Sequence, residues 1–375
     1  MKRIYYIVTV AIFTLFVSGC GEDRSHGSDN LDESGKKTSW IYDSDQGKLM
    51  VENNFVYIPG GFDVDGDGVK EGGFWISKYE AKDDNTTDKT IDVSDITNIQ
   101  NFLAENFQVF NANSKMFDKS LTQDSGYSIS SASDIVGLSA SKIIFNETGD
   151  IVRNISPLEA VISLQSSQID GGYEILLPSE KQWMHLVKLI TNNPENWTGK
   201  EIGKGKLFQG NRYTMSDRRT FVIENSILGE DQYVPKDYKV DVYDLSGGVA
   251  EWTSGMIAIE DRFLTGDSGK QEYNDINSIP SWWKPILKDQ TISLGSIEGA
   301  GQYHDGSAIA GTNDSLVVNA DGTKGDVDNY AVVARGGSNS VDDNTLVGIG
   351  AAKLNYGAGY QGPTVGFRAA SDYLY

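Results

Sequence analysis

The 375-residue chain has a single cysteine, eight prolines and three histidines. Because Cys20 is the only cysteine, no intramolecular disulfide and no metal site made of several cysteines can form. The histidines His26, His185 and His304 are widely spaced, and the chain has no His-Glu-x-x-His, Walker or Gly-x-Ser-x-Gly motif. The sequence therefore lacks the common signatures of zinc proteases, P-loop nucleotide-binding enzymes and serine hydrolases.

Basic residues are also scarce, with 32 Lys and Arg against 53 Asp and Glu and a formal net charge of −21. A nucleic-acid partner is not expected, because binding phosphates requires the opposite charge. Such acidity mainly keeps a protein soluble, and it leaves cations and basic surfaces as compatible partners. The 39% hydrophobic residues and 41 glycines are typical of a folded, turn-rich protein.

The amino terminus has the pattern of a secretory signal over residues 1–19. Lys2 and Arg3 precede an apolar run, 4–17, that is too short to favour a membrane-spanning helix. Small residues and then Cys20 follow, which is typical of a bacterial lipoprotein signal. We expect the Cys20 thiol to be lipidated and Cys20 to become the first residue of the mature protein. An uncleaved anchor with a buried Cys20 is the alternative.

Residues 20–49 are interpreted as a flexible tether, since the stretch 22–37 is polar and has Leu31 as its only apolar residue. Residues 50–375 then form one large domain. Gly21 rather than Asp follows the cysteine, which favours the outer membrane in an organism with two membranes. We therefore expect a lipid-anchored, surface-exposed protein of the bacterial cell envelope.

An acidic turn is the clearest candidate for a metal site. Asp63, Asp65 and Asp67 alternate with other residues and a glycine follows, as in the first half of a calcium loop. The twelfth loop position is Phe74 instead of a bidentate Glu, and Glu71 substitutes only in part. Both a Ca²⁺ site and a plain acidic turn between two strands are compatible with this pattern.

Two helices are predicted from their first residues. Ser156, a following proline and Glu159 form an N-cap, a first-turn proline and a capping box. Ser179 and Gln182 repeat the capping box. The apolar stripe of this second helix consists of Trp183, Leu186, Val187 and Ile190. His185 lies off the stripe and is expected at the surface.

Strands are predicted at residues 218–223 and 239–243, and short buried strands at 332–334 and 365–370. Between the last two, residues 339–363 are rich in Gly, Asn, Asp, Ser and Tyr. Such a composition does not build a core of its own, but it suits loops held on a rigid scaffold.

Several motifs occur in an order that resembles a known family. They are Tyr57–Gly61 with Phe74–Glu80, Ile175–Trp183, Val242–Trp252, and Arg335–Ser338 with Val365–Ala370. Together they resemble the formylglycine-generating enzyme (sulfatase-modifying factor) superfamily, whose fold is a variant of the C-type lectin fold. The resemblance implies a loop-rich α+β domain with a few helices and small mixed or antiparallel sheets, and residues 108–154 as an insertion.

The resemblance also indicates what the protein lacks. The family's enzymes use two cysteines after the Arg-Gly-Gly-Ser motif, and Val341 and Leu346 occupy those places here, so a soft metal ion has no ligand. The related iron-dependent sulfoxide synthases need a histidine cluster. We therefore expect a binding protein and not an enzyme. The alternative is a sulfatase-modifying-factor-type enzyme with non-standard catalytic residues.

Glu251 is a further candidate calcium ligand by resemblance, because the matching family segment supplies a calcium site. Gly248 replaces the family's Asn and Ala250 its Trp, which leaves Glu251 as the remaining side-chain ligand. Glu251 and Trp252 are expected at the centre of the fold.

The segment 339–361 is the expected ligand surface. Tyr, Asn, Ser and Gly are residues that paratopes favour. Family members that serve as variable proteins of diversity-generating retroelements carry their diversified positions in this region. The candidate contacts to a protein or carbohydrate at the cell surface are Asn339, Ser340, Asp342, Asp343, Asn344, Asn355, Tyr356 and Tyr360. Two alternatives are compatible with this segment: a loop whose sequence is diversified by a retroelement, and an ordinary loop whose sequence is fixed.

Overall fold

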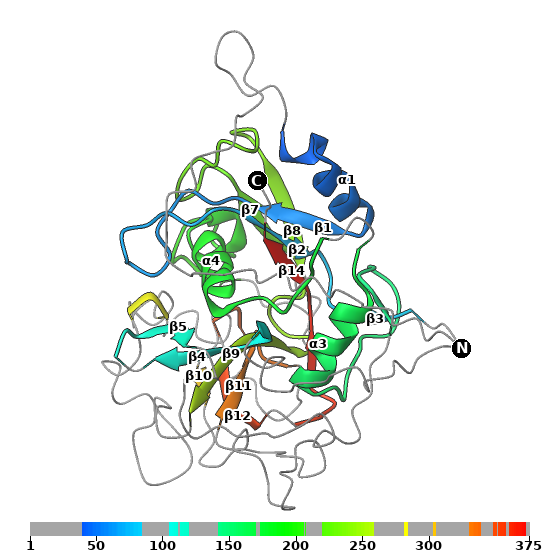
Figure 1. Cartoon of the computed structure of the whole chain (residues 1–375). Helices are drawn as coiled ribbons and strands as arrows, with labels where there is room; N and C mark the ends of the chain where they lie inside the picture. The colour runs from blue at the N-terminus through cyan, green and yellow to red at the C-terminus, as the bar shows by residue number, and fades with distance from the viewer. Residues whose placement is uncertain are drawn as a thin grey trace, which may run out of the picture. The chain divides into compact units, whose positions relative to one another are not determined.

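The computed structural model describes thirteen parts of the chain, which are drawn as ribbons in Figure 1. They are residues 40–84, 105–111, 113–119, 142–169, 173–205, 207, 220–258, 281–283, 303–304, 330–338, 348–350, 352–357 and 360–372. All of them belong to one compact unit, Ser39–Leu374.

A mixed seven-stranded sheet is the largest element among these residues. Its strands follow the order β10-β12-β11-β9-β4-β5, and β13 also pairs with β9. Their bounds are β4 Gln108–Asn111, β5 Met116–Lys119, β9 Ala250–Ala258, β10 Tyr303–His304, β11 Tyr330–Arg335, β12 Ala352–Gly357 and β13 Val365–Phe367. β9 lies at the centre, antiparallel to β11 and parallel to both β4 and β13.

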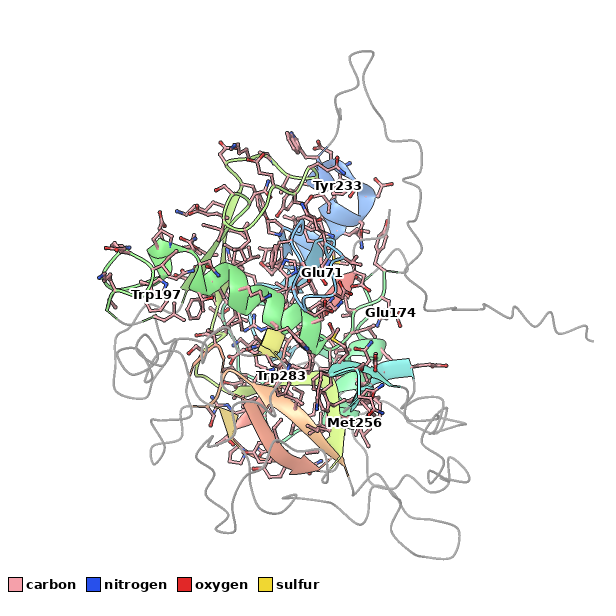
Figure 2. All side chains as sticks on the ribbon, turned by 90° about the vertical axis from the view of Figure 1, so that its left-hand side faces the viewer. Glu71, Glu174, Trp197, Tyr233, Met256 and Trp283 are labelled. Carbon is pink, nitrogen blue, oxygen red and sulfur yellow. The ribbon has the colours of Figure 1, made fainter. Side chains whose placement is uncertain are left out.

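Both faces of this sheet are covered, which explains its apolar strands. Along β11, Val332 belongs to one buried cluster and Val333 to another, as expected when successive side chains point to opposite faces. On β9, Met256 belongs to the first cluster and Ile257 to the second (Figure 2 labels Met256). Trp252 is also fully buried, so the prediction that it lies at the centre of the fold is confirmed.

A second sheet joins the two ends of the described chain. It has the order β1-β2-β14, with bounds β1 Phe55–Ile58, β2 Phe74–Ser77 and β14 Ala370–Asp372. Two further antiparallel pairs complete the sheets, namely β3 (Lys82–Asp83) with β6 (Ile143–Ile144) and β7 (Thr220–Glu224) with β8 (Lys239–Tyr243). The structure confirms the predicted strand at 239–243, which is β8. The strand predicted at 218–223 corresponds to β7, which is described from residue 220 to residue 224 and pairs with β8.

Three α-helices occur in the described residues: α1 Asp45–Glu52, α3 Pro157–Ser166 and α4 Glu180–Thr191. Short 3₁₀ helices are η1 Ile41–Asp43, η5 Pro194–Asn196 and η7 Ser281–Trp283. Both predicted capping boxes are present. The Ser156 hydroxyl accepts from the Glu159 N–H at 3.2 Å, and that of Ser179 accepts from the Gln182 N–H at 3.1 Å. The predicted apolar stripe of α4 is completely buried.

His185 is the residue of α4 that we predicted wrongly. It is buried, its ring lies 4.3 Å from that of Phe62 and 5.4 Å from that of Phe74, and its Nε2 lies 2.7 Å from the Pro59 carbonyl oxygen. Burial lowers the pKa of His185 to about 4, so the ring is neutral at pH 7. The periodicity showed one buried face, but the segment after β1 covers a second face of the helix.

The predicted tether is too long at its carboxyl end. Residues 40–49 fold into η1 and most of α1, where Ile41 is buried and its N–H donates to the Tyr233 carbonyl at 3.0 Å. Ser44 caps α1 by accepting from the Gly47 N–H. The stretch is mostly polar, so its composition did not indicate that Ile41 is buried. The remainder of the predicted tether lies outside the described residues.

The observed class is α+β with several small mixed and antiparallel sheets, as predicted. Residues 108–154, interpreted as an insertion, contribute β4 and β5 to the main sheet, so this stretch is part of the core where it is described. A helix long and apolar enough to cross a membrane does not occur in the described parts of the chain.

Candidate functional site

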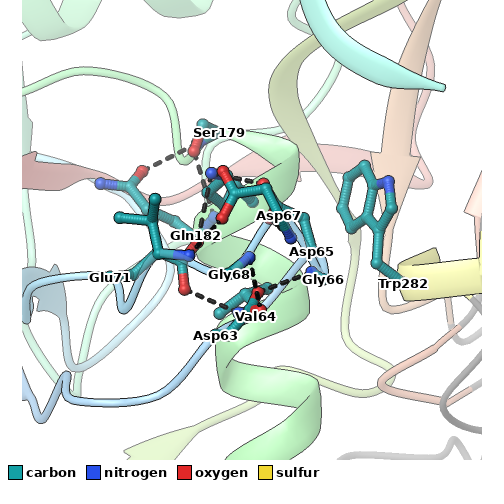
Figure 3. A network of polar contacts seen from close by, with 12 residues as sticks. Asp63, Val64, Asp65, Gly66, Asp67, Gly68, Glu71, Ser179, Gln182 and Trp282 are labelled. Carbon is teal, nitrogen blue, oxygen red and sulfur yellow. Dashed lines mark hydrogen bonds and ion pairs between the residues drawn. The ribbon is translucent and has the colours of Figure 1, made fainter. Parts of the chain in front are cut away.

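The acidic turn between β1 and β2 brings together the four carboxylates that the sequence singled out. One oxygen from each of Asp63, Asp65, Asp67 and Glu71 lies within 4.8 Å of the others. Figure 3 shows the turn beside the first residues of α4. The four side chains could therefore hold one metal ion such as Ca²⁺.

Backbone hydrogen bonds fix the shape of the turn. The Asp63 carboxylate accepts from the Gly66 N–H at 2.6 Å and from the Gly68 N–H at 2.9 Å (Figure 3). Both glycines have positive φ, 86° and 89°, which other residues adopt only with strain. The same hydrogen bonds, that from Gly66 first, lower the pKa of Asp63. Asp67 accepts from the Val69 N–H at 2.7 Å, so the turn is built by its own sequence.

Two lysines of α4 hold the turn against the helix. Lys181 Nζ lies 2.5 Å from Asp65 Oδ2 and 3.2 Å from Glu71 Oε1. Both oxygens are buried, and the Lys181 ammonium group compensates their negative charge. Lys188 Nζ donates to the Val64 carbonyl and, at 3.4 Å, to that of Asp63.

The chemistry of this donor set suits a hard cation. Carboxylate and carbonyl oxygens are the ligands that Ca²⁺ takes, at about 2.3–2.6 Å. Asp65 is already almost completely buried, whereas Asp67 is exposed and leaves one side of the cluster open to solvent. A divalent ion in this position would compete with the Lys181 ammonium group, because that group already contacts the carboxylates of both Asp65 and Glu71.

Glu251 does not belong to this cluster, which corrects its assignment as a calcium ligand. Its Oε1 accepts from Arg368 Nη2 at 2.6 Å and its Oε2 from Arg368 Nε, and both side chains are fully buried. Arg368 also donates to the Ser77 carbonyl at 3.0 Å and to that of Tyr243 at 2.8 Å. A guanidinium group therefore takes the place that a cation would occupy.

A buried carboxyl group, Glu80, was missed by sequence reasoning. Its Oε1 accepts from the Val249 N–H at 3.1 Å, while its Oε2 lies 4.0 Å from Lys82 Nζ and accepts no hydrogen bond from a described residue. Burial, and next the negative charges of Glu251 and Asp244, raise the pKa of Glu80 to about 8. Glu80 is therefore protonated at pH 7.

Gly248 was the available signal for this close packing. A Cβ added at Gly248 would lie 2.6 Å from Glu80 Oε1, and its φ is 79°. By resemblance, Gly248 replaces an Asn that is a calcium ligand in the family. In the structure, the missing side chain leaves space for the buried carboxyl group of Glu80.

A second buried ion pair joins α4 to the main sheet. Arg335 donates to Glu180 Oε2 from Nε at 3.0 Å and from Nη2 at 2.5 Å, and Thr253 donates to Glu180 Oε1 at 2.5 Å. The guanidinium carbon lies 4.2 Å from the centre of the Trp283 ring, which Figure 2 labels. Arg335 and Arg368 thus fix the chain directly before and after the predicted ligand surface.

The structure places few of the predicted contact residues. Asn339, Ser340, Asp342, Asp343 and Asn344 lie outside the described residues, as does the predicted lipidation site Cys20. Asn355 lies in β12.

Tyr356 is a core residue, which corrects its assignment as an exposed contact. It is 7% exposed, stacks on Tyr360 with ring centres 3.9 Å apart, and meets the edge of Trp252 at 5.7 Å. Tyr360 is half-buried in this stack. Loop-like composition did not reveal that β12 is a paired strand.

Comparisons with known proteins show only distant similarity. No protein-family model matches the chain, and no curated protein matches it. Among solved structures, CarF superimposes with a TM-score of 0.31 at 12% identity, covering 85% of this chain and 98% of CarF. Variable protein 1 of Treponema denticola superimposes with a TM-score of 0.27 at 13% identity, covering 85% and 94%. At these scores neither likeness carries an argument, and the lectin-like fold stays a prediction.

Proposed function

We propose that the protein is a lipid-anchored binding protein of the bacterial cell envelope that presents residues 339–361 to a protein or carbohydrate at the cell surface. The observation that supports this is the pair of buried ion pairs on either side of the segment, Arg335–Glu180 and Arg368–Glu251. Removing one partner of such a pair typically costs about 3–5 kcal/mol, because it leaves a buried charge. The ends of the segment are therefore fixed by the scaffold.

The residues next to Arg335 add to this rigidity. Gly336 has a φ of 78°, and a Cβ there would lie 2.6 Å from the Leu245 carbonyl oxygen. The Gly336 carbonyl accepts from the N–H groups of Gly247, at 3.0 Å, and Gly348, at 3.1 Å. When both ends are held in this way, we expect substitutions at the polar residues before β12 to leave the fold intact, whereas the buried residues of β12 belong to the scaffold. With Tyr356 in the core, the contacts fall on the polar residues 339–344 and on Tyr360.

A variant with alanine at Asn339, Ser340, Asp342, Asp343 and Asn344 tests this proposal. We expect wild-type protein to bind members of a glycan array or of an array of purified extracellular proteins. The fivefold variant should lose that binding while its melting temperature stays within a few degrees of wild type. Tyr356→Phe, which keeps the ring stack, is the matched control and should bind as wild type. Equal binding by wild type and the fivefold variant would contradict the proposal. Turnover of a substrate would support the enzyme alternative.

We further propose that the acidic turn binds Ca²⁺ and that the ion stabilises the fold. The observation that favours this is the convergence of four carboxylates within 4.8 Å. A ligand that binds only the folded state stabilises it by about 2.7 kcal/mol at a hundred times its Kd. Calcium should therefore raise the melting temperature relative to chelator. Asp65→Asn should abolish the rise, whereas Asp45→Asn, at an exposed side chain of α1, should preserve it. Identical melting with Ca²⁺ and with chelator would contradict the proposal.

A further inference from the structure

A cavity of about 250 Å³ lies where the two main sheets approach the first turn of α4. Residues at the start of β4, Ser254 of β9, the last residues of β14 and the capping residues of α4 line it. The cavity involves neither the carboxylates of the acidic turn nor residues 339–361.

Polar side chains from separate elements line this cavity. Glu105 and Gln108 are exposed at its opening, Ser254 is buried, and none of the three side chains forms a hydrogen bond with the described residues. Asp372 also lines it, and its Oδ1 accepts from Gln182 Nε2 at 3.0 Å. One carboxylate is thus oriented by the helix cap, and the other three groups are available to a ligand.

The charge of the lining selects the class of ligand. Among the described residues that line the cavity there are two carboxylates, Glu105 and Asp372, and no Lys, Arg or His. Bringing an anion between them would add repulsion, in a protein of net charge −21. An ammonium group, with three N–H donors, is complementary to carboxylate, amide and hydroxyl oxygens, which this lining offers at Glu105, Asp372, Gln108 and Ser254.

The remaining wall and the volume set the size of the ligand. Phe107 and Leu177 contribute apolar surface, against which methylene groups can pack. The volume is below the roughly 300–1,000 Å³ typical of pockets for drug-sized molecules. From the two carboxylates, the other polar side chains of the lining and the apolar wall we propose that this cavity binds a small aliphatic amine.

Putrescine, butanediol and succinate are matched probes, because they share a four-carbon chain and differ in charge. We expect titration calorimetry on the purified protein to show saturable binding of putrescine and none of butanediol or succinate. Glu105→Gln and Asp372→Asn should each weaken putrescine binding by about tenfold, since each removes one charge and keeps the shape. The amide oxygen of Asp372→Asn can still accept from Gln182, so the fold should be preserved.

Glu52→Gln, at an exposed residue of α1, is the control for non-specific attraction to an acidic protein. It should leave the putrescine affinity unchanged. Equal binding of putrescine and butanediol would overturn the inference of charge selection. Equal weakening by Glu52→Gln and by the cavity variants, or an absence of putrescine binding, would overturn the site itself. Melting temperatures of all variants within a few degrees of wild type ensure that these results report on binding.

Discussion

Replacing Glu80 by Gln should remove a large part of the pH dependence of stability. In the folded protein the carboxyl group is buried, and its pKa is raised to about 8 from an ordinary value of 4.5. Each unit of pKa difference corresponds to about 1.4 kcal/mol. The difference therefore amounts to at most about 5 kcal/mol of unfolding free energy.

The sign follows from proton binding. Between pH 4.5 and 8 the unfolded chain releases the Glu80 proton, while the folded protein retains it. The free energy of unfolding contributed by this group is therefore fully present below pH 4.5 and is lost as pH rises to about 8. A Gln side chain does not titrate, and its oxygen can still accept from the Val249 N–H. The advantage of Glu80→Gln over wild type should thus grow by about 1.4 kcal/mol per pH unit in this range.

Urea unfolding followed by tryptophan fluorescence at pH 5, 6, 7 and 8 measures this difference. Glu52→Gln, at an exposed position, should run parallel to wild type across the series. A constant difference between Glu80→Gln and wild type would refute the reasoning, because it would show that Glu80 ionises in the folded protein as it does in the unfolded chain.

Three further predictions concern the buried and paired side chains. Lys181→Met should lower the melting temperature in chelator and enlarge the rise in melting temperature produced by Ca²⁺, because the carboxylates lose their internal counter-ion. Calorimetry should show tighter Ca²⁺ binding. An unchanged Ca²⁺ affinity would contradict competition between Lys181 and Ca²⁺. Arg368→Met should destabilise the fold by about 3–5 kcal/mol in urea unfolding, since Glu251 is left buried without a partner; a loss below 1 kcal/mol would refute the pairing. Tyr356→Ala should lower the free energy of unfolding by about 3–5 kcal/mol, as for other buried aromatic residues, whereas Tyr356→Phe should lower it little. Near-wild-type stability of the alanine variant would contradict the assignment of Tyr356 to the core.

Local signals made part of the structure predictable. The capping boxes at Ser156 and Ser179 and the apolar stripe of α4 depend on residues within one helix, and the structure has them as expected. The acidic turn was predictable for the same reason, since alternating carboxylates and glycines determine its backbone.

Features that depend on distant partners were not predictable. His185 is buried because the segment around Phe62 covers it, and Tyr356 is buried because β12 pairs with β11. Glu80 follows an aromatic strand and reads as an ordinary surface acid until Val249 and Glu251 are placed beside it. In each case the sequence shows the residue, but only the three-dimensional contact shows its environment.

The pairing of β13 and β14 has a consequence for how the chain acquires its structure. Residues 365–367 complete one side of β9, and residues 370–372 complete the sheet that begins with β1 and β2. Contacts between such distant segments form late, since long loops must close first. During synthesis from the amino end, neither sheet can therefore be completed until residues 365–372 have been made. A truncation before residue 365 would remove one strand from each sheet, so the protein should tolerate loss of its last folded segment far less than loss of a peripheral one.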